Sequence, residues 1–280
     1  MSSQPARRLM AMLAHPDDES LGVGGTLAKY ASEGVEVFLV TATRGDGGRY
    51  HGHASGDHRH PGPLMLGNIR ETELRRAATE LGIREVSLLD YPDQHLDDAD
   101  PREAVGRLVA ALRRTRPDVV VTFGPDGAYG HPDHIAISQF ATAAIVSAAS
   151  SAFVAGNGGD ELQPHSVSKL YYLAWPASTW AVYQSAVRTL SSTVDGLERR
   201  ATPWPDWAIT TTIDTSEAWS TVWRAVSCHE SQLTAYEHLK DLSPEHHRML
   251  WGRQSFYRVF STVNGGRARE TDLFEGLRHS

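Results

Sequence analysis

The sequence has almost no cysteine, no long hydrophobic run and no cluster of positive charge. Its one cysteine, Cys228, cannot form a disulfide within the chain, so the composition does not argue for an oxidising compartment. No apolar stretch approaches the ~20 residues that a membrane-spanning helix needs, and the first residues lack the apolar core of a signal peptide. These absences predict a cytoplasmic protein without a membrane partner.

Charged residues of both signs are mixed along the chain. The 27 Lys and Arg residues against 34 Asp and Glu residues give a net charge of -7, and no Lys or Arg run is long enough to follow a phosphate backbone. Nucleic acid is therefore not an expected partner. The oligomeric state cannot be read from the sequence, which leaves a homo-oligomer open.

The first half of the chain alternates β-type and helical patterns. Apolar runs at 9–14, 35–42, 86–89 and 118–123 alternate with helical patterns at 21–32, 66–81, 102–115 and 135–149. This alternation predicts a mostly parallel sheet with crossover helices, in a Rossmann-like three-layer α/β sandwich. Several strands are almost continuously apolar, as expected when both faces of a sheet are covered.

The second half is less regular and begins with a Gly-rich stretch at 155–160. We expect strands at 169–173, 208–213 and 255–263 and a helix at 216–228. The predicted organisation is one domain over residues 1–280, in which 1–150 form the Rossmann-like catalytic core. Residues 151–280 are a C-terminal extension that completes the sheet and walls the pocket.

A His-Pro-Asp tripeptide occurs twice, at 15–17 and 131–133, each time where a strand is expected to lead into a helix. In parallel sheets ligands bind beyond the carboxyl ends of the strands, so both tripeptides fall at the functional edge. Helix capping accounts for each Pro and for one acid. It does not account for the preceding histidines, for three consecutive acids at 17–19 or for His134. Imidazole and carboxylate groups are ligands of open zinc sites, so the pattern predicts a metal centre.

The two segments Ala14-His15-Pro16-Asp17-Asp18-Glu19 and His131-Pro132-Asp133-His134 resemble the PIG-L/LmbE-like family of zinc-dependent N-acetyl amino-sugar deacetylases, which includes a mycothiol-pathway deacetylase. Similar segments follow at 70–74, 90–93 and 228–232. The resemblance implies zinc-dependent hydrolysis of the acetamide of an N-acetylglucosamine-type sugar or conjugate, giving a free amine and acetate. It further implies one Zn²⁺ per chain, with three protein ligands and a general base: His15, Asp18 and His134 as ligands and Asp17 as the base.

The remaining catalytic roles follow from the resemblance together with the chemistry. His131, three residues before His134, would stabilise the tetrahedral oxyanion as an imidazolium, and Asp133 would fix its orientation. Tyr129 matches a tyrosine that reaches towards the same oxyanion in relatives. Contacts to the substrate are expected from Arg70, Asp93 and His229.

Two departures from the family pattern leave the shape of the sugar pocket open. The family usually has Gly after the residue that matches Asp93, whereas Gln94 stands here, and Asp46 occupies the place of a more common Glu. A long connection at 44–63 carries His51, His53, His58 and His60. Long loops are commonly lids and flexible His-rich tracts bind metals weakly, so we interpret this loop as a mobile flap rather than a second metal site.

Three other functions compete with deacetylation. A zinc amidase that acts on a larger thiol or antibiotic conjugate would carry the same ligands, and a non-catalytic sugar-binding protein would keep the fold. A nicotinamide-dependent oxidoreductase is suggested only by Gly22-Val23-Gly24-Gly25, where Leu27 stands in place of the third Gly of the dinucleotide pattern. The expected partner is a small amino-sugar conjugate whose identity the sequence leaves open.

Overall fold

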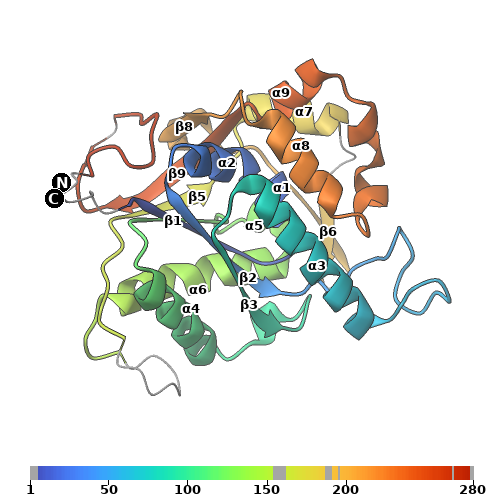
Figure 1. Cartoon of the computed structure of the whole chain (residues 1–280), viewed down its shortest axis with the longest axis horizontal. Helices are drawn as coiled ribbons and strands as arrows, with labels where there is room; N and C mark the ends of the chain where they lie inside the picture. The colour runs from blue at the N-terminus through green and yellow to red at the C-terminus, as the bar shows by residue number, and fades with distance from the viewer. Residues whose placement is uncertain (1–5, 154–161, 187–190, 195, 267, 278–280) are drawn as a thin grey trace.

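The computed structural model describes residues 6–153, 162–186, 191–194, 196–266 and 268–277. The Gly-rich stretch 155–160 therefore lies outside the described residues. A seven-stranded sheet runs through the molecule in the order β3-β2-β1-β4-β5-β9-β8 (Figure 1). Its strands are β1 (Arg8–Leu13), β2 (Glu36–Thr43), β3 (Glu85–Tyr91), β4 (Val119–Thr122), β5 (Lys169–Leu173), β8 (Thr211–Asp214) and β9 (Arg253–Ser261).

The centre of the sheet is formed by the most apolar runs of the sequence. On β1, Leu9 pairs with Val37 of β2 and with Val119 of β4, and all three side chains are fully buried. The pairings from β3 across to β5 are parallel, whereas β9 pairs antiparallel with both β5 and β8. The predicted mostly parallel α/β sheet is thus confirmed, and strands from the C-terminal half extend it.

Helices cover both faces of the sheet. In Figure 1, α4 and α6 lie below the sheet, while α2, α3 and α8 lie on the opposite side. The α-helices are α1 (Asp18–Leu21), α2 (Gly24–Ser32), α3 (Pro63–Leu81), α4 (Pro101–Thr115), α5 (Gly127–Gly130), α6 (Pro132–Ala148), α7 (Ala177–Ala186), α8 (Trp219–Cys228) and α9 (Pro244–Trp251). Three 3₁₀ helices occupy Leu96–Asp98, Asp206–Ala208 and Leu233–Asp241. This arrangement confirms the predicted three layers.

The helix expected at 21–32 is divided into two. Helix α1 ends at Leu21 and α2 begins at Gly24, so the segment that contains Asp18 and Glu19 has a short helix of its own. At Gly25, an added Cβ would lie 2.9 Å from Thr215 Cβ, which shows why a glycine is needed where α2 packs against the C-terminal half.

Several elements of the second half were not predicted. These are α7, α9 and a two-stranded hairpin of β6 (Ser191–Val194) and β7 (Leu197–Arg200). The strand expected at 208–213 begins only at Thr211, because the 3₁₀ helix Asp206–Ala208 precedes it. None of the described helices is both long and apolar enough to cross a membrane.

A buried ionic network ties the last segment of the chain to the sheet. The fully buried Lys169 Nζ lies 2.7 Å from Glu270 Oε1, and Arg258 Nη1 lies 2.8 Å from the same oxygen. Tyr171 and Thr211 donate hydroxyl hydrogen bonds to the other oxygen, at 2.7 and 2.9 Å. Burial alone would raise the pKa of Glu270, but these donors, with Lys169 foremost, lower it to about 2.

Replacement of Glu270 tests this network. Glu270→Gln removes the charge and leaves Lys169 buried without a counter-ion, so the free energy of unfolding at pH 7 should fall by about 3 kcal/mol. The folded-state pKa is depressed, so the carboxylate stabilises the wild type above its unfolded pKa, and that stabilisation is lost as the pH falls towards about 2. Urea denaturation should therefore show the difference between wild type and variant shrinking below about pH 4.5. A pH-independent difference would contradict this account.

Candidate active site

The loops after two adjacent strands, β1 and β4, meet at the carboxyl edge of the sheet. His15 follows β1, and His134 lies in the first turn of α6, which Pro132 starts. His15 Nδ1 and His134 Nε2 are 3.2 Å apart although 119 residues separate them in the chain. The ring of Phe123, just after β4, stacks on His134 with a centroid distance of 3.9 Å and an angle of 7°. Backbone topology and packing thus bring the two His-Pro-Asp segments together.

The contacts among His15, Asp18 and His134 have the length expected between neighbouring ligands of a tetrahedral metal site, and the two oxygens of Asp18 each make one of them. Besides the 3.2 Å between the two imidazole nitrogens, Asp18 Oδ1 lies 3.4 Å from His134 Nε2, and Asp18 Oδ2 lies 3.5 Å from His15 Nδ1. Ligands at the usual zinc distances of 2.0–2.1 Å in a tetrahedron are separated by about 3.4 Å. The residues present therefore fit a zinc ion.

The outer nitrogen of each histidine is occupied by a hydrogen-bond partner. His15 Nε2 lies 2.9 Å from Asp133 Oδ2 and 3.1 Å from Asp93 Oδ1, and His134 Nδ1 lies 3.2 Å from the Gly127 carbonyl. Such partners fix the ring orientation and leave the inner nitrogen with its lone pair for a metal. Burial opposes the charged form of His15, but Asp133, Asp18 and Asp93 together raise its pKa well above the usual value.

The structure corrects the role expected for Asp133. Its carboxylate does not orient His131: Oδ2 lies against His15 and accepts the Gln94 N–H at 2.8 Å, while Oδ1 accepts the Leu96 N–H at 3.0 Å. Only the backbone N–H of Asp133 contacts His131, as the donor to its Nδ1 at 3.2 Å. The side chain points back into the fold because the first turn of α6 directs it towards the loop after β3.

His131 is held as a neutral side chain. Burial and the neighbouring imidazoles of His15 and His134 lower its pKa to about 4, so the imidazolium expected from the sequence is not the resting form. Since Nδ1 accepts a backbone N–H as the N-cap of α6, the proton of the neutral ring lies on Nε2. His131 therefore presents an N–H donor. Nitrogens of His15, His131 and His134 also lie within 4.8 Å of one another, and so do ligand atoms of His15, Asp93 and Asp133, so each set is an alternative group of ligands.

Asp17 and Asp18 line the same pocket although they are consecutive residues. Asp17 makes this possible with a backbone φ of 96°, in the left-handed region that side chains rarely adopt. Burial raises the pKa of Asp17 despite the nearby Arg70, whereas the His134 and His15 imidazoles hold the pKa of Asp18 well below its usual value against the effect of burial. One carboxylate is thus suited to bind a cation and the other to accept a proton.

A cavity of about 230 Å³ opens over these groups. Its lining includes Tyr129, whose pKa burial raises, so the phenol keeps its proton. Gln94, which the sequence had linked to the shape of the pocket, lines the cavity, and so do residues without an assigned role: Leu21, Gly22, Gly48, Phe123, Ala128, Trp175, Tyr183 and Gln232. Trp175 and Tyr183 stack with a centroid distance of 4.9 Å. Trp175 follows the carboxyl end of β5, the same position that marks His15 after β1, and that position could have revealed it.

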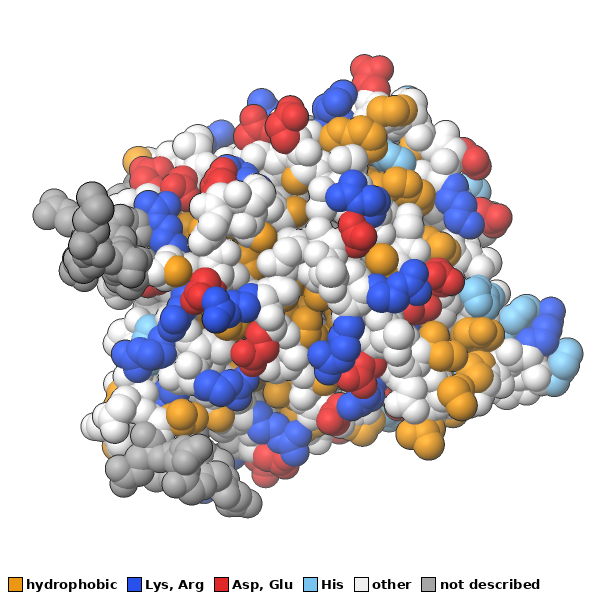
Figure 2. All heavy atoms as spheres, viewed as in Figure 1, with side chains coloured by type: hydrophobic (Ala, Val, Ile, Leu, Met, Phe, Trp, Pro, Cys, Tyr) orange, Lys and Arg blue, Asp and Glu red, His pale blue; other side chains and the backbone are white. Residues whose placement is uncertain are grey.

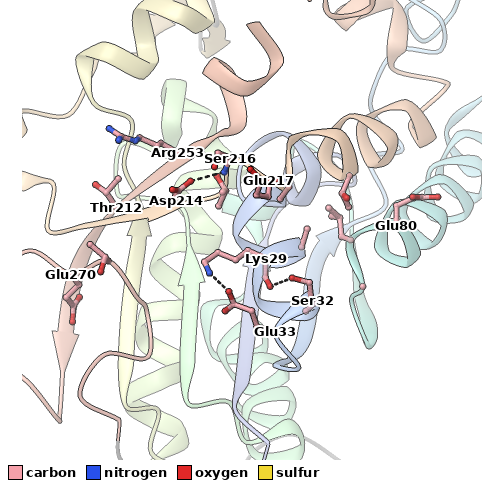
Figure 3. A pocket seen from close by; sticks show the side chains of 18 of the residues that line it. Lys29, Ser32, Glu33, Glu80, Thr212, Asp214, Ser216, Glu217, Arg253 and Glu270 are labelled. Carbon is pink, nitrogen blue, oxygen red and sulfur yellow. Dashed lines mark hydrogen bonds and ion pairs between the residues drawn. The ribbon is translucent and has the colours of Figure 1, made fainter. Parts of the chain in front are cut away.

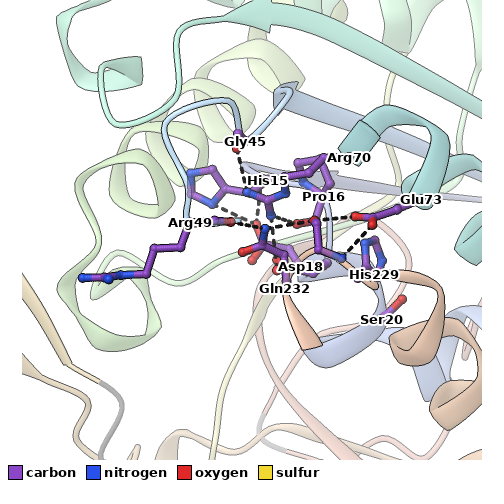
Figure 4. Close-up of polar contacts among 12 residues, drawn as sticks. His15, Pro16, Asp18, Ser20, Gly45, Arg49, Arg70, Glu73, His229 and Gln232 are labelled. Carbon is purple, nitrogen blue, oxygen red and sulfur yellow. Dashed lines mark hydrogen bonds and ion pairs between the residues drawn. The ribbon is translucent and has the colours of Figure 1, made fainter. Parts of the chain in front are cut away.

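The three residues expected to contact a substrate are placed differently from one another. Arg70 and Asp93 line the cavity, but Arg70 is only 4% exposed and donates to the Gly45 and Pro16 carbonyls (Figure 4). It also donates to Asp17 Oδ2. His229 is fully buried, with Nε2 2.7 Å from Glu19 Oε1. The expectation of a direct substrate contact from His229 is therefore wrong, because Glu19 and the end of α8 enclose the ring.

The loop between β2 and α3 is tied to the rest of the molecule. The His51 N–H donates to the Ser231 carbonyl at 2.8 Å, and Gln232 Nε2 donates to the Arg49 carbonyl at 2.7 Å. His60 Nε2 lies 3.2 Å from the Gly48 carbonyl, beside the cavity. These bonds hold the loop over the site through the turn that follows α8.

A larger hollow of about 1070 Å³ lies elsewhere, among α2, α8 and β8 (Figure 3). Some of its charged side chains are already partnered, such as Lys29 with Glu33, and Asp214 with the backbone N–H of Ser216. Within the described part of the chain, the groups able to hold a metal ion include none of its lining residues. On the face drawn in Figure 2, acidic and basic side chains are interspersed. The chemistry is thus concentrated in the smaller cavity.

Comparison with known proteins places this site in a family. The family model described as PIG-L, GlcNAc-PI de-N-acetylase, matches residues 10–145. The chain is 33% identical to the 1D-myo-inositol 2-acetamido-2-deoxy-alpha-D-glucopyranoside deacetylase of Streptomyces avermitilis, over 99% of both chains. The chain belongs to the PIG-L family. The predicted family and the predicted enzyme class, a hydrolase that removes an acetyl group from an amide nitrogen, are confirmed.

Solved structures show how widely this fold is used. The chain superposes on N,N'-diacetylchitobiose deacetylase from Pyrococcus horikoshii with a TM-score of 0.67 and 22% identity, over 91% of this chain and 84% of that one. It also superposes on 4-carboxy-2-hydroxymuconate hydratase from Pseudomonas putida KT2440 with a TM-score of 0.64 and 18% identity, over 94% and 100% of the two chains. At these identities the likeness concerns the fold alone, so the roles of residues in this PIG-L protein rest on its own geometry.

The support that Asp133 gives to His15 is testable. Asp133→Ala should weaken the affinity for Zn²⁺ by about 10–100-fold, because His15 loses the carboxylate that fixes its ring. Competition with a chromophoric chelator measures this affinity. Asp100→Asn, at the N-cap of α4, is the control and should leave it unchanged. Equal affinities for Asp133→Ala and wild type would contradict the assignment.

Proposed function

We propose that this protein is a zinc-dependent deacetylase of an N-acetylglucosamine-type sugar or conjugate. The observation that carries the proposal is the set of three contacts, 3.2, 3.4 and 3.5 Å long, that join the two imidazole nitrogens of His15 and His134 to each other and to the two carboxylate oxygens of Asp18. Asp17 lines the same cavity and takes part in none of these three contacts. Three ligands with an open fourth position and an adjacent base are the arrangement that metal-assisted amide hydrolysis needs.

The proposed base acts from a fixed position. When bound, zinc acidifies a coordinated water and polarises the acetyl carbonyl. Asp17 takes a proton from the attacking water and later delivers it to the leaving amine nitrogen. The buried surroundings that raise the pKa of Asp17 bring the carboxyl closer to the working pH, which favours both transfers. Arg70 Nη2, 3.2 Å from Asp17 Oδ2, fixes the carboxylate and opposes the rise in its pKa.

Two hydrogen-bond donors are available for the negative charge that develops on the acetyl oxygen. The neutral His131 carries its proton on Nε2, and the Tyr129 phenol stays protonated. Both side chains line the cavity. We infer that they donate to the oxyanion in place of the imidazolium that the sequence suggested.

The rest of the cavity suits one sugar ring. Asp93 and Gln94 offer polar groups on one side, and the stacked pair Trp175 and Tyr183 offers an apolar wall. The curated relative from Streptomyces avermitilis is named for an inositol-linked N-acetylglucosamine. We therefore propose a small N-acetylated glucosaminide as the substrate class, bound by a single domain over residues 1–280, because β8 and β9 complete the sheet that carries the site.

Removal of the base separates catalysis from metal binding. Asp17→Asn should retain stoichiometric zinc and lose at least about 10²-fold in kcat for release of acetate from N-acetylglucosamine conjugates. Elemental analysis and an amine-release assay measure the two quantities. Asp97→Asn, an exposed acid on the 3₁₀ helix near the site, should behave as wild type. Near-normal turnover by Asp17→Asn would exclude it as the base.

The two histidines of the second segment should differ in their effects. His134→Ala should lose the metal, whereas His131→Ala should keep it and lose about 10²–10³-fold in kcat, because only an oxyanion donor is removed. Metal content after dialysis and kcat together measure this difference. Loss of zinc from His131→Ala would assign it as a ligand. Zinc without amine release from any N-acetylated sugar by the wild type would favour a sugar-binding protein.

A further inference from the structure

The peptide unit between Pro16 and Asp17 is hydrogen-bonded to buried side chains at both its carbonyl oxygen and its N–H. Its carbonyl oxygen, on Pro16, accepts from Arg70 Nη2 at 2.5 Å, and its N–H, on Asp17, donates to Glu19 Oε2 at 3.0 Å. This is the peptide that leads into the left-handed backbone of Asp17, with φ 96° and ψ -24°. A backbone conformation so unfavourable for a side chain persists only where the surroundings hold it.

Glu19 is in turn held by a residue from the other half of the chain. Its second oxygen, Oε1, lies 2.7 Å from His229 Nε2 and accepts the Ser20 hydroxyl at 2.5 Å. Both Glu19 and His229 have no exposed surface, and neither lines the cavity. A buried carboxylate needs such donors, since without them it would be too costly to keep ionised. The bond from Glu19 to the Asp17 N–H therefore depends on His229.

The same helix that supplies Arg70 also fixes the segment that carries His229. Glu73 of α3 accepts the backbone N–H and the hydroxyl of Ser231, both at 2.7 Å. Figure 4 shows Arg70, Glu73 and His229 around Pro16. Residues of α3 and of the segment at the end of α8, which are hydrogen-bonded to each other, thus position both polar groups of the 16–17 peptide.

We propose that Glu19 and His229 are positioning residues that hold the Asp17 carboxylate in its catalytic orientation by fixing the 16–17 peptide. The inference rests on the proposed function in that it takes Asp17 as the base. Glu19 and His229 touch neither the cavity nor the expected ligands with their side chains, so their effect on the reaction passes through Asp17. Without these hydrogen bonds the peptide can rotate so that Asp17 adopts a more favourable negative φ. This rotation moves the Asp17 carboxylate away from the reacting atoms.

A double-mutant cycle tests this route. Glu19→Leu should lower kcat by about 10²-fold with KM nearly unchanged and zinc retained, because a displacement of about 1 Å of a catalytic group has that effect. In the Asp17→Asn background the same change should produce little further loss, since the base it positions is already gone. Glu19→Gln should keep most of kcat, because the amide oxygen still accepts the Asp17 N–H. His229→Phe, which keeps a ring but removes the donor, should follow Glu19→Leu.

Loss of stability needs its own control. Glu270→Gln removes another buried, hydrogen-bonded carboxylate that does not line the cavity and should destabilise the fold without changing kcat. If Glu19→Leu does not fold, His229→Phe takes its place and is compared with Glu19→Gln in the same way. Additive losses of Glu19→Leu and Asp17→Asn, or equal losses for Glu19→Gln and Glu19→Leu, would overturn the proposal.

Crystal structures give a readout that does not depend on activity. Wild type should keep Asp17 at positive φ, and Glu19→Leu or His229→Phe should show the 16–17 peptide rotated and the Asp17 carboxylate displaced. An unchanged Asp17 in both variants would overturn the positioning role whatever the substrate is. Absence of acetate release by the wild type would instead refute the proposed function. A rotated peptide in the variants would still show that Glu19 and His229 fix the position of Asp17.

Discussion

The hydrogen bond between His15 Nε2 and Asp133 Oδ2, 2.9 Å long, joins the loops after β1 and β4, and the geometry of the site depends on it. It turns His15 so that Nδ1 faces His134 Nε2 and Asp18. Asp133 can make this bond because the start of α6 is fixed by Pro132 and by the His131 N-cap. Its other oxygen accepts the Leu96 N–H, so the loop after β3 is fixed by the same carboxylate.

The electrostatics of the site follow from the same packing. Asp17, Asp18, Asp93 and Asp133 gather negative charge around His15, and three of these acids raise the pKa of its imidazole. A divalent cation would neutralise this negative charge in place of the proton on His15. The inner nitrogen of His15 would then be available as a ligand. Asp17 is not among those three acids: burial raises its own pKa, and its ion pair with Arg70 only partly opposes that rise.

The sequence allowed the sheet, its helices and the two motif segments to be predicted, because apolar runs and His-Pro-Asp junctions are local signals. It did not allow the partners of buried groups to be predicted. Asp133 was expected to orient His131, whereas its carboxylate reaches His15, 118 residues away. His229 was taken for a substrate contact, and only the three-dimensional packing of α8 shows it enclosed with Glu19. Tyr183, which stacks on Trp175 in the pocket wall, lies on α7, and the sequence of this helix has little amphipathic pattern.

Because the same fold occurs in proteins with other reactions, the position of the metal among the atoms of this site is the most direct test of its chemistry. Diffraction data collected at the zinc absorption edge from crystals of the zinc-loaded protein should show one anomalous peak about 2.1 Å from His15 Nδ1, His134 Nε2 and an Asp18 oxygen. A peak bound by His131 in place of Asp18, or one on the outer side of His15 between Asp93 and Asp133, would contradict the account.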